Sequence, residues 1–173
     1  MLSVAFVVFL VASVALRLWL AVRQIRHVAR HRDQVPAQFA DRISVTAHRR
    51  AADYTVAKVR LGILDNLISA VVLVALTLLG GLQWLADAWA DLLDGWPLMQ
   101  QVAIVVSVVV LTALIELPLD LWRQFRLEAR YGFNRMTLRL FLADLVKSTA
   151  IGAAIGLPLL AAVIGLMQRA GTS

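Results

Sequence analysis

The chain has 173 residues, of which 61% are hydrophobic and only 16% are charged, and its formal net charge is +6. Soluble domains carry about 25% charged residues, and the apolar residues here are concentrated in four blocks, so the composition excludes an ordinary soluble domain. The absence of cysteine excludes disulfides and cysteine-ligated metal sites. The sequence therefore predicts an all-α, polytopic membrane protein with four transmembrane helices.

The first apolar block, residues 1–22, is followed directly by Arg23, Arg26 and Arg30. A secretory signal peptide carries its positive charge before the apolar stretch, so we expect a retained span with its N-terminus outside. Each of the other blocks has about the 20 residues that a helix needs to cross the hydrocarbon core. They predict spans over residues 66–86, 95–115 and 148–168.

The connections between the spans alternate in charge. Residues 23–60 contain nine Arg and Lys against three Asp, and residues 123–147 contain six against two acids. The connection between the second and third spans has Asp87, Asp91 and Asp94 but no basic residue. The positive-inside rule then places 23–60 and 123–147 in the cytoplasm and both ends of the chain outside. No groove-reading motif accompanies the positive charge, which argues against nucleic-acid binding.

The first basic connection is too long for a simple turn and is not rich in Gly, Ser or Pro. Pro36 suits the first position of a helix. Apolar residues then recur at helical spacing, at Phe39, Ile43, Ala47, Ala51 and Tyr54. We expect one or two cytoplasmic amphipathic helices here, either touching anionic lipid headgroups with their basic face or forming the wall of an enzyme vestibule.

Residues that could bind a metal or perform catalysis are scarce. His27 and His31 have the i,i+4 spacing of metal ligands, but a zinc-protease motif requires Glu after the first His, where this chain has Val28. Arginines on both sides would repel a cation. The sequence contains no HExxH, Gly-x-Ser-x-Gly, Walker loop or dinucleotide fingerprint. We therefore assign no catalytic residue, metal ligand or cofactor to this chain.

Charged residues are unusually dense where the third span ends. Helical spacing places Glu116, Asp120, Arg123, Leu127 and Arg130 along one stripe. A charge deep in lipid costs about 3 kcal/mol, so these side chains should face protein, water or the interface. Two interpretations remain open: a salt-bridged corner between two helices, or a polar cavity lined by Glu116, Asp120 and Arg123. The candidate network also includes Glu128, and Pro118 predicts a kink beside the acids.

The segment Gly132, Phe133 and Asn134 predicts a tight structural corner. Gly132 suits a left-handed helix stop, and Asn134 suits the cap of the next helix. That helix is predicted to begin at Arg135 and to run into the fourth span. Its apolar side would carry Met136, Leu140, Phe141 and Leu145.

The stretch LPLDLWRQFRLEARYGFNRMTLRLFLADLVKS, residues 117–148, closely resembles the N-terminal membrane region of the type 1 CAAX prenyl proteases, a family of integral-membrane zinc metalloproteases. The matching elements are Glu128, Gly132-Phe133-Asn134, Thr137 and the helix 140–147. A second match lies in the first basic connection, at Arg23-Gln24, Val35-Pro36, Ala51, Tyr54 and Lys58.

The resemblance implies a zinc metalloendopeptidase whose helices enclose a chamber, in which zinc held by HExxH and a downstream Glu cuts a prenylated or membrane-proximal peptide. It implies that residues 1–173 form a single membrane domain supplying chamber wall and substrate path. The zinc machinery would lie in a missing C-terminal catalytic half, its partner in the bilayer. Because the chain reaches Ser173 without HExxH, we expect it to be inactive alone, as part of a longer protease or a stand-alone relative.

Two other functions remain open at this point. The chain could be a non-catalytic membrane scaffold or assembly protein, or a small ion-coupled transporter that uses Glu116 and Asp120. No internal inverted repeat, which many transporter folds contain, is visible in the sequence. The composition, rich in Ala, Leu, Val and Arg, favours a bacterial inner membrane.

Overall fold

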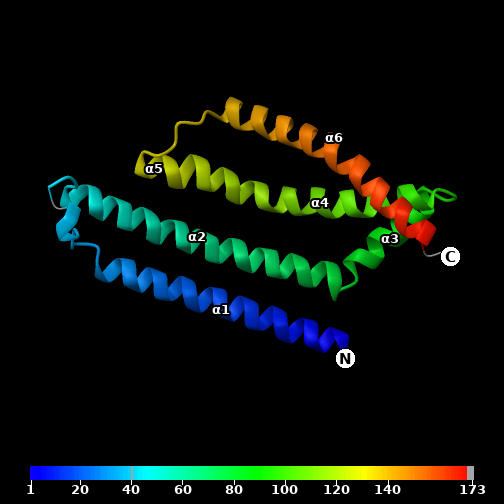
Figure 1. Ribbon diagram of the computed structural model, residues 1–173, viewed down its shortest axis with the longest axis horizontal. Helices are drawn as coiled ribbons and strands as arrows, with labels where there is room; N and C mark the ends of the chain where they lie inside the picture. Colours follow the sequence, from blue (N-terminus) through cyan, green and yellow to red (C-terminus); the bar gives the residue numbers. More distant parts are fainter. Residues whose placement is uncertain (40, 171–173) are drawn as a thin grey trace. The chain divides into compact units, whose positions relative to one another are not determined.

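The computed structural model describes residues 1–39 and 41–170, and within them the chain is helical with no strand. This confirms the predicted all-α class. The elements in chain order are α1 (Leu2–Arg30), η1 (Ala37–Phe39), α2 (Val45–Thr77), α3 (Gly81–Leu92), α4 (Pro97–Trp122), η2 (Arg123–Glu128), α5 (Ala129–Tyr131) and α6 (Leu138–Ala170) (Figure 1).

Four helical stretches are long and apolar enough to cross a membrane. They are α1, α2, α6 and the continuous stretch α4–η2–α5, residues Pro97–Tyr131. Each has more than the 20 or so residues that the hydrocarbon core requires. The apolar windows of all four are unburied within the described residues, as expected of helices that face lipid or further protein. The chain is therefore an integral membrane protein.

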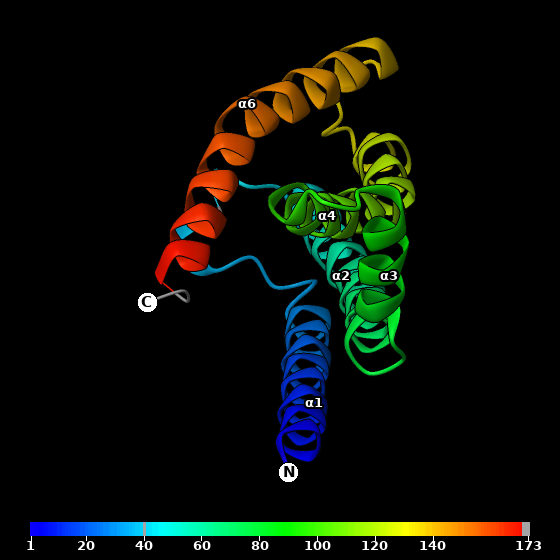
Figure 2. The ribbon, with the colours of Figure 1, turned by 90° about the vertical axis from the view of Figure 1, so that its right-hand side faces the viewer.

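The chain forms two compact units. The first contains Met1–Val74 and Glu116–Asn134, and so holds α1, most of α2 and the end of the α4–η2–α5 stretch. In this unit α1 and α2 lie side by side and run antiparallel (Figures 1 and 2). Ion pairs between Arg32 and Asp53 and between Arg49 and Asp33 join the end of α1 to the start of α2. The candidate site lies in this unit.

The first basic connection contains one short 3₁₀ turn and the start of α2, instead of the separate amphipathic helices that the sequence predicted. Pro36 precedes a short 3₁₀ turn, Ala37–Phe39, instead of opening an amphipathic helix. The predicted amphipathic positions Ala47, Ala51 and Tyr54 belong to α2, which continues without a break into the membrane. Ser44 explains why α2 begins where it does, because its hydroxyl accepts a hydrogen bond from Ala47 N–H at 3.2 Å.

The second unit contains Ala75–Ile115 and the chain from Arg135 onward. Its structure corrects the predicted span 66–86, because α2 ends at Thr77 and α3 begins at Gly81. Gly80 has a φ of 81°, a left-handed conformation that glycine adopts without steric cost and that interrupts the helix. Trp89 of α3 donates a hydrogen bond to the Ser107 hydroxyl of α4 at 2.9 Å, which joins these two helices.

Gly81 is the first residue of α3 and directly follows the tight turn from α2. A Cβ at this position would lie 2.8 Å from the carbonyl oxygen of Ala75 and 3.0 Å from the Cα of Leu76, both backbone atoms. We expect Gly81→Ala to destabilise the protein by about 1–2 kcal/mol, as overpacking does. The change is measured as a shift in thermal unfolding in detergent. Gly165→Ala is the matched control, since nothing lies within 4 Å of its new Cβ. Equal stability of the two variants would contradict this turn.

The last helix, α6, does run from the second basic connection into the fourth span as predicted, but it begins at Leu138. Thr137, and not Asn134, directly precedes it, and the Thr137 hydroxyl accepts a hydrogen bond from Leu140 N–H at 3.2 Å. Figure 2 shows that α6 is bent along its length. Pro158 lies inside the helix and cannot donate to the carbonyl of Ala154, which accounts for a bend there.

Candidate functional site

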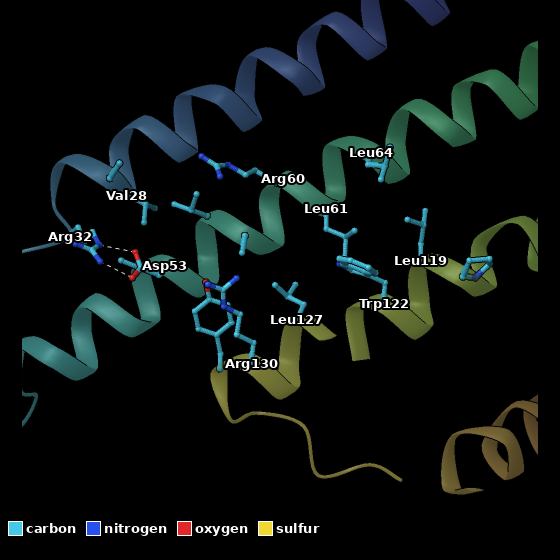
Figure 3. Close-up of a pocket in the computed structure, with 16 residues that line it drawn as sticks. Val28, Arg32, Asp53, Arg60, Leu61, Leu64, Leu119, Trp122, Leu127 and Arg130 are labelled. Atoms are coloured by element: carbon cyan, nitrogen blue, oxygen red, sulfur yellow. Dashed lines mark hydrogen bonds and ion pairs between the residues drawn. The ribbon is translucent and has the colours of Figure 1, made fainter. Parts of the chain in front are cut away.

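A cavity of about 980 Å³ lies in the first unit. Its walls come from the end of α1, the first half of α2 and the stretch from Pro118 to Tyr131 (Figure 3). One part of the wall is apolar, with Leu61 and Leu64 on α2 and Leu119 and Trp122 on α4. The other part is charged, with Arg32, Asp53, Arg60 and Arg130.

Arg32 and Asp53 form a bidentate ion pair at this cavity. The guanidinium donates two hydrogen bonds to the two carboxylate oxygens, from Nε and Nη2, each at 2.7 Å. These hydrogen bonds lower the pKa of the Asp53 carboxyl, which lies in the polar first half of α2 outside the apolar span. The bidentate geometry fixes the end of α1 against α2. Both side chains remain 42% exposed, so water reaches the pair.

The segment from Arg123 to Glu128, η2, is a π-helix inside the continuous helical stretch. π-helical turns are rare in proteins, and those that do occur are often found at functional sites. At its first residue, Arg123 donates a hydrogen bond to Asp120 at 2.8 Å and pairs with Asp65 of α2 at 3.6 Å. Asp65, Asp120 and Arg123 therefore form an interhelical charge cluster, which we call the acidic clamp.

The corner after α5 is a Schellman motif. Gly132 has a φ of 79°, the left-handed conformation that the sequence predicted. Its N–H donates to the Ala129 carbonyl at 3.1 Å, and the Phe133 N–H donates to the Glu128 carbonyl at 2.9 Å. These two bonds satisfy carbonyl groups that a helix end leaves free.

Aromatic residues hold this corner against α2. The Tyr54 ring lies 5.5 Å from the ring of Tyr131 and 4.7 Å from that of Phe133, centroid to centroid. Such pairs stabilise by about 0.5–1.5 kcal/mol beyond their buried area. Gln124 also donates to the Asn134 side-chain oxygen at 2.9 Å. The corner and the start of α2 consequently lie at the same end of the first unit.

The predicted site residues are thus divided between two features. Asp120 and Arg123 belong to the acidic clamp, whereas Arg130 lines the cavity. Glu116, half-buried, has no ion pair or hydrogen bond from its side chain among the described residues, and it does not line the cavity. Glu128 contributes its carbonyl to the corner.

The π-helix explains why the stripe is divided. The predicted stripe assumed one α-helical register from Glu116 to Arg130. A π-turn takes more residues per turn than an α-helix, so Leu127 and Arg130 point to a different side from Asp120 and Arg123.

Several residues of the candidate site were missed by reasoning from the sequence. Asp65 was recognised only as the edge of a span, although a carboxylate beside an apolar run needs a cationic partner. Arg32, Asp53 and Arg60 were seen only as part of a basic connection. Asp53 and Arg60 are seven residues apart, so both lie on one face of a helix, and that face also carries apolar residues. This spacing was the signal available in the sequence for these two residues.

The residues present do not fit a zinc site. The His27 and His31 rings are 4.4 Å apart, and His31 Nδ1 is 2.8 Å from the His27 carbonyl oxygen, which occupies a potential ligand atom. The pocket beside them is lined by Arg23, Arg26 and Arg30. Within residues 1–39 and 41–170, no group of three or more His, Cys, Asp or Glu could hold a metal ion.

The fold resembles that of a solved membrane protein. The crystal structure of S. mikatae Ste24p matches with a TM-score of 0.77 and 22% sequence identity, over 96% of this chain and 39% of that chain. At this identity the likeness concerns the fold.

Curated relatives match in sequence. A Caenorhabditis elegans CAAX prenyl protease 1 homolog is 26% identical over 174 residues, covering 98% of this chain and 38% of the relative. An Arabidopsis thaliana CAAX prenyl protease 1 homolog is 30% identical over 74 residues, 43% of this chain and 18% of the relative. The CAAX prenyl protease 1 of Saccharomyces cerevisiae is 42% identical over 50 residues, 29% of this chain and 11% of the relative. The chain thus spans well under half the length of these relatives.

A family match covers most of the sequence. Residues 24–173 match the family described as CAAX prenyl protease N-terminal, five membrane helices. The described part of this chain has four helices long enough to span a membrane and the shorter α3. The match begins at the first basic connection and includes the acidic clamp, the π-helix and the Gly132 corner. The chain belongs to the CAAX prenyl protease N-terminal family.

Proposed function

We propose that this chain is the N-terminal membrane domain, residues 1–173, of a CAAX prenyl protease-like zinc metalloendopeptidase. It would form part of the chamber wall and the path of a membrane-proximal or prenylated peptide. The family match over residues 24–173 carries the proposal, because it covers both basic connections and all but the first span. The zinc-binding catalytic part would be supplied by the C-terminal half of the protein.

The exposure of the helices supports a role as a wall. Among the described residues only Ala52, Leu85, Leu127 and Ile164 are buried. Lipid can cover one side of such helices, but a protein with a large exposed apolar surface also offers a surface for further protein. Helices that pack against a catalytic half on one side and against lipid on the other would expose both apolar sides when that half is absent.

The experiment is a proteolysis assay with the protein expressed from its complete natural coding region. We expect zinc-dependent cleavage of a farnesylated peptide by that protein, and no cleavage by residues 1–173 alone. A natural coding region that ends near Ser173, with no chelator-sensitive activity, would instead support the non-catalytic scaffold. No observation favours the transporter, since Asp120 is paired with Arg123.

We also propose the orientation with both basic connections in the cytoplasm, and the bacterial inner membrane as the location. The contacts of Tyr54 with Tyr131 and Phe133 support one side for both connections, because residues in contact outside the bilayer share a compartment. The location rests on composition, and the relatives named above are eukaryotic.

The absence of native cysteine allows a direct test of this orientation. We expect a membrane-impermeant maleimide added to intact cells to label Asp91→Cys. Val45→Cys and Arg139→Cys should be labelled only after the cells are permeabilised. The unsubstituted chain is the blank. Labelling of Val45→Cys and Asp91→Cys from the same side would overturn the orientation.

A further inference from the structure

The cavity of the first unit crosses the expected boundary between hydrocarbon and water. On α2, Arg60 directly precedes the run Leu61–Thr77, in which Asp65 is the only charged residue. Figure 3 shows Leu61 and Leu64 opposite Leu119 and Trp122 at one end of the cavity, with Arg32, Asp53 and Arg130 toward the other. The wall therefore changes from apolar to charged along α2, as the bilayer does.

The charges of this wall do not balance. Among the described residues of the wall, three guanidinium groups, of Arg32, Arg60 and Arg130, face a single carboxylate, that of Asp53. Asp53 is engaged by Arg32 through two hydrogen bonds. Within the described residues, neither Arg60 nor Arg130 has a carboxylate oxygen within 4.0 Å. Both side chains are exposed. Arg60 therefore lies at the edge of the apolar cavity without an ion pair to any described residue, and Arg130 has only a longer-range attraction to Asp53.

We propose that this cavity binds one anionic phospholipid, with its phosphate against Arg60 and Arg130 and an acyl chain along Leu61, Leu64 and Trp122. Guanidinium groups bind phosphate oxygens in a bidentate manner, and basic pockets between membrane helices bind anionic headgroups. A free phosphate ion would leave the apolar wall without a ligand. The proposal does not require the protease function.

The first test is native mass spectrometry of the full chain in detergent, titrated with phosphatidylglycerol or with phosphatidylcholine of the same acyl chains. We expect clear preference for phosphatidylglycerol. Arg60→Gln and Arg130→Gln should each weaken its binding about fivefold, and together about 25-fold, because each basic residue near a headgroup contributes about 1 kcal/mol. Arg42→Gln is the matched control, an exposed arginine of the same unit outside the cavity, and should leave affinity unchanged.

The second test locates the acyl chain. Phosphatidylglycerol with brominated acyl chains should quench part of the tryptophan fluorescence, and that part should be missing in Trp122→Phe. Brominated phosphatidylcholine at the same concentration should quench the two proteins equally. This comparison uses unaltered arginines, so it decides the proposal even if the double glutamine variant fails to fold.

Three results would overturn the proposal. The first is equal phosphatidylglycerol affinity of the wild type and the double glutamine variant. The second is displacement of the lipid by inorganic phosphate at the lipid's own concentration, which would make this a simple anion site. The third is displacement by a prenylated peptide together with no preference between the two lipids, which would assign the cavity to a peptide.

Discussion

Arg123→Leu is expected to destabilise the protein by about 2 kcal/mol. The substitution leaves Asp65 and Asp120 beside the apolar spans without the cation that both now contact. An unpaired carboxylate at the centre of a membrane helix costs about 3 kcal/mol, and we reduce this value because the Asp65 and Asp120 side chains are 38% and 48% exposed. The loss is measured by thermal or denaturant unfolding in detergent.

Two variants make this result specific to the acidic clamp. Glu116→Gln, one helical turn before Asp120, should change stability by less than about 0.5 kcal/mol, because Glu116 has no partner among the described residues. Adding Asp65→Asn and Asp120→Asn to Arg123→Leu should restore most of the lost stability, since no unpaired charge then remains. If the triple variant is no more stable than Arg123→Leu, the clamp does not act as the geometry indicates.

Gly132→Val is expected to destabilise the protein by about 2–3 kcal/mol. Gly132 has a φ of 79°, which a β-branched residue adopts only with strain. Forcing this residue out of the left-handed region would break its hydrogen bond to Ala129 and that of Phe133 to Glu128. The effect should be visible as lower thermal stability and lower yield of folded protein.

Most of the expected loss of stability comes from backbone strain at Gly132, and little of it from steric crowding. Two control variants separate these two causes. A Cβ at Gly132 would lie 3.4 Å from Nη2 of Arg50, a flexible side chain that can move. Gly132→Asn should therefore retain most of the stability, because Asn tolerates the left-handed region. Gly152→Val, at an open helical position, should be close to neutral in a membrane helix. Wild-type stability of Gly132→Val would rule out the corner.

The number of spans was predictable because it depends on hydropathy summed over long windows. Nearly all of each of the blocks 1–22, 95–115 and 148–168 falls within one helical stretch, and charge patterning marked both basic connections. Gly132 was predictable for a local reason, since only glycine adopts this turn readily. The break at Gly80 was missed because Leu78 and Leu79 continue the apolar pattern through it.

The candidate site was less accessible from the sequence. Arg123 meets Asp65 across two helices, so neither residue's sequence neighbours reveal the pair. The contact of Arg123 with Asp120 could be predicted, because residues three apart on a helix are neighbours. The cavity could not be predicted, because its lining depends on how α1 and α2 pair and on a π-turn that no residue of Arg123–Glu128 signals on its own.

The π-turn gives the stretch Pro97–Tyr131 two independent phases. Before the π-turn, the helical register brings Asp120 and Arg123 close to Asp65. After it, a different register places Leu127 and Arg130 in the cavity wall and Tyr131 beside Tyr54. Deleting one residue from Arg123–Glu128 would return the stretch to a single α-helical phase and swing everything beyond it by about 100°. A protein built this way can tolerate an exchange of side chains in η2 more easily than a change in its length.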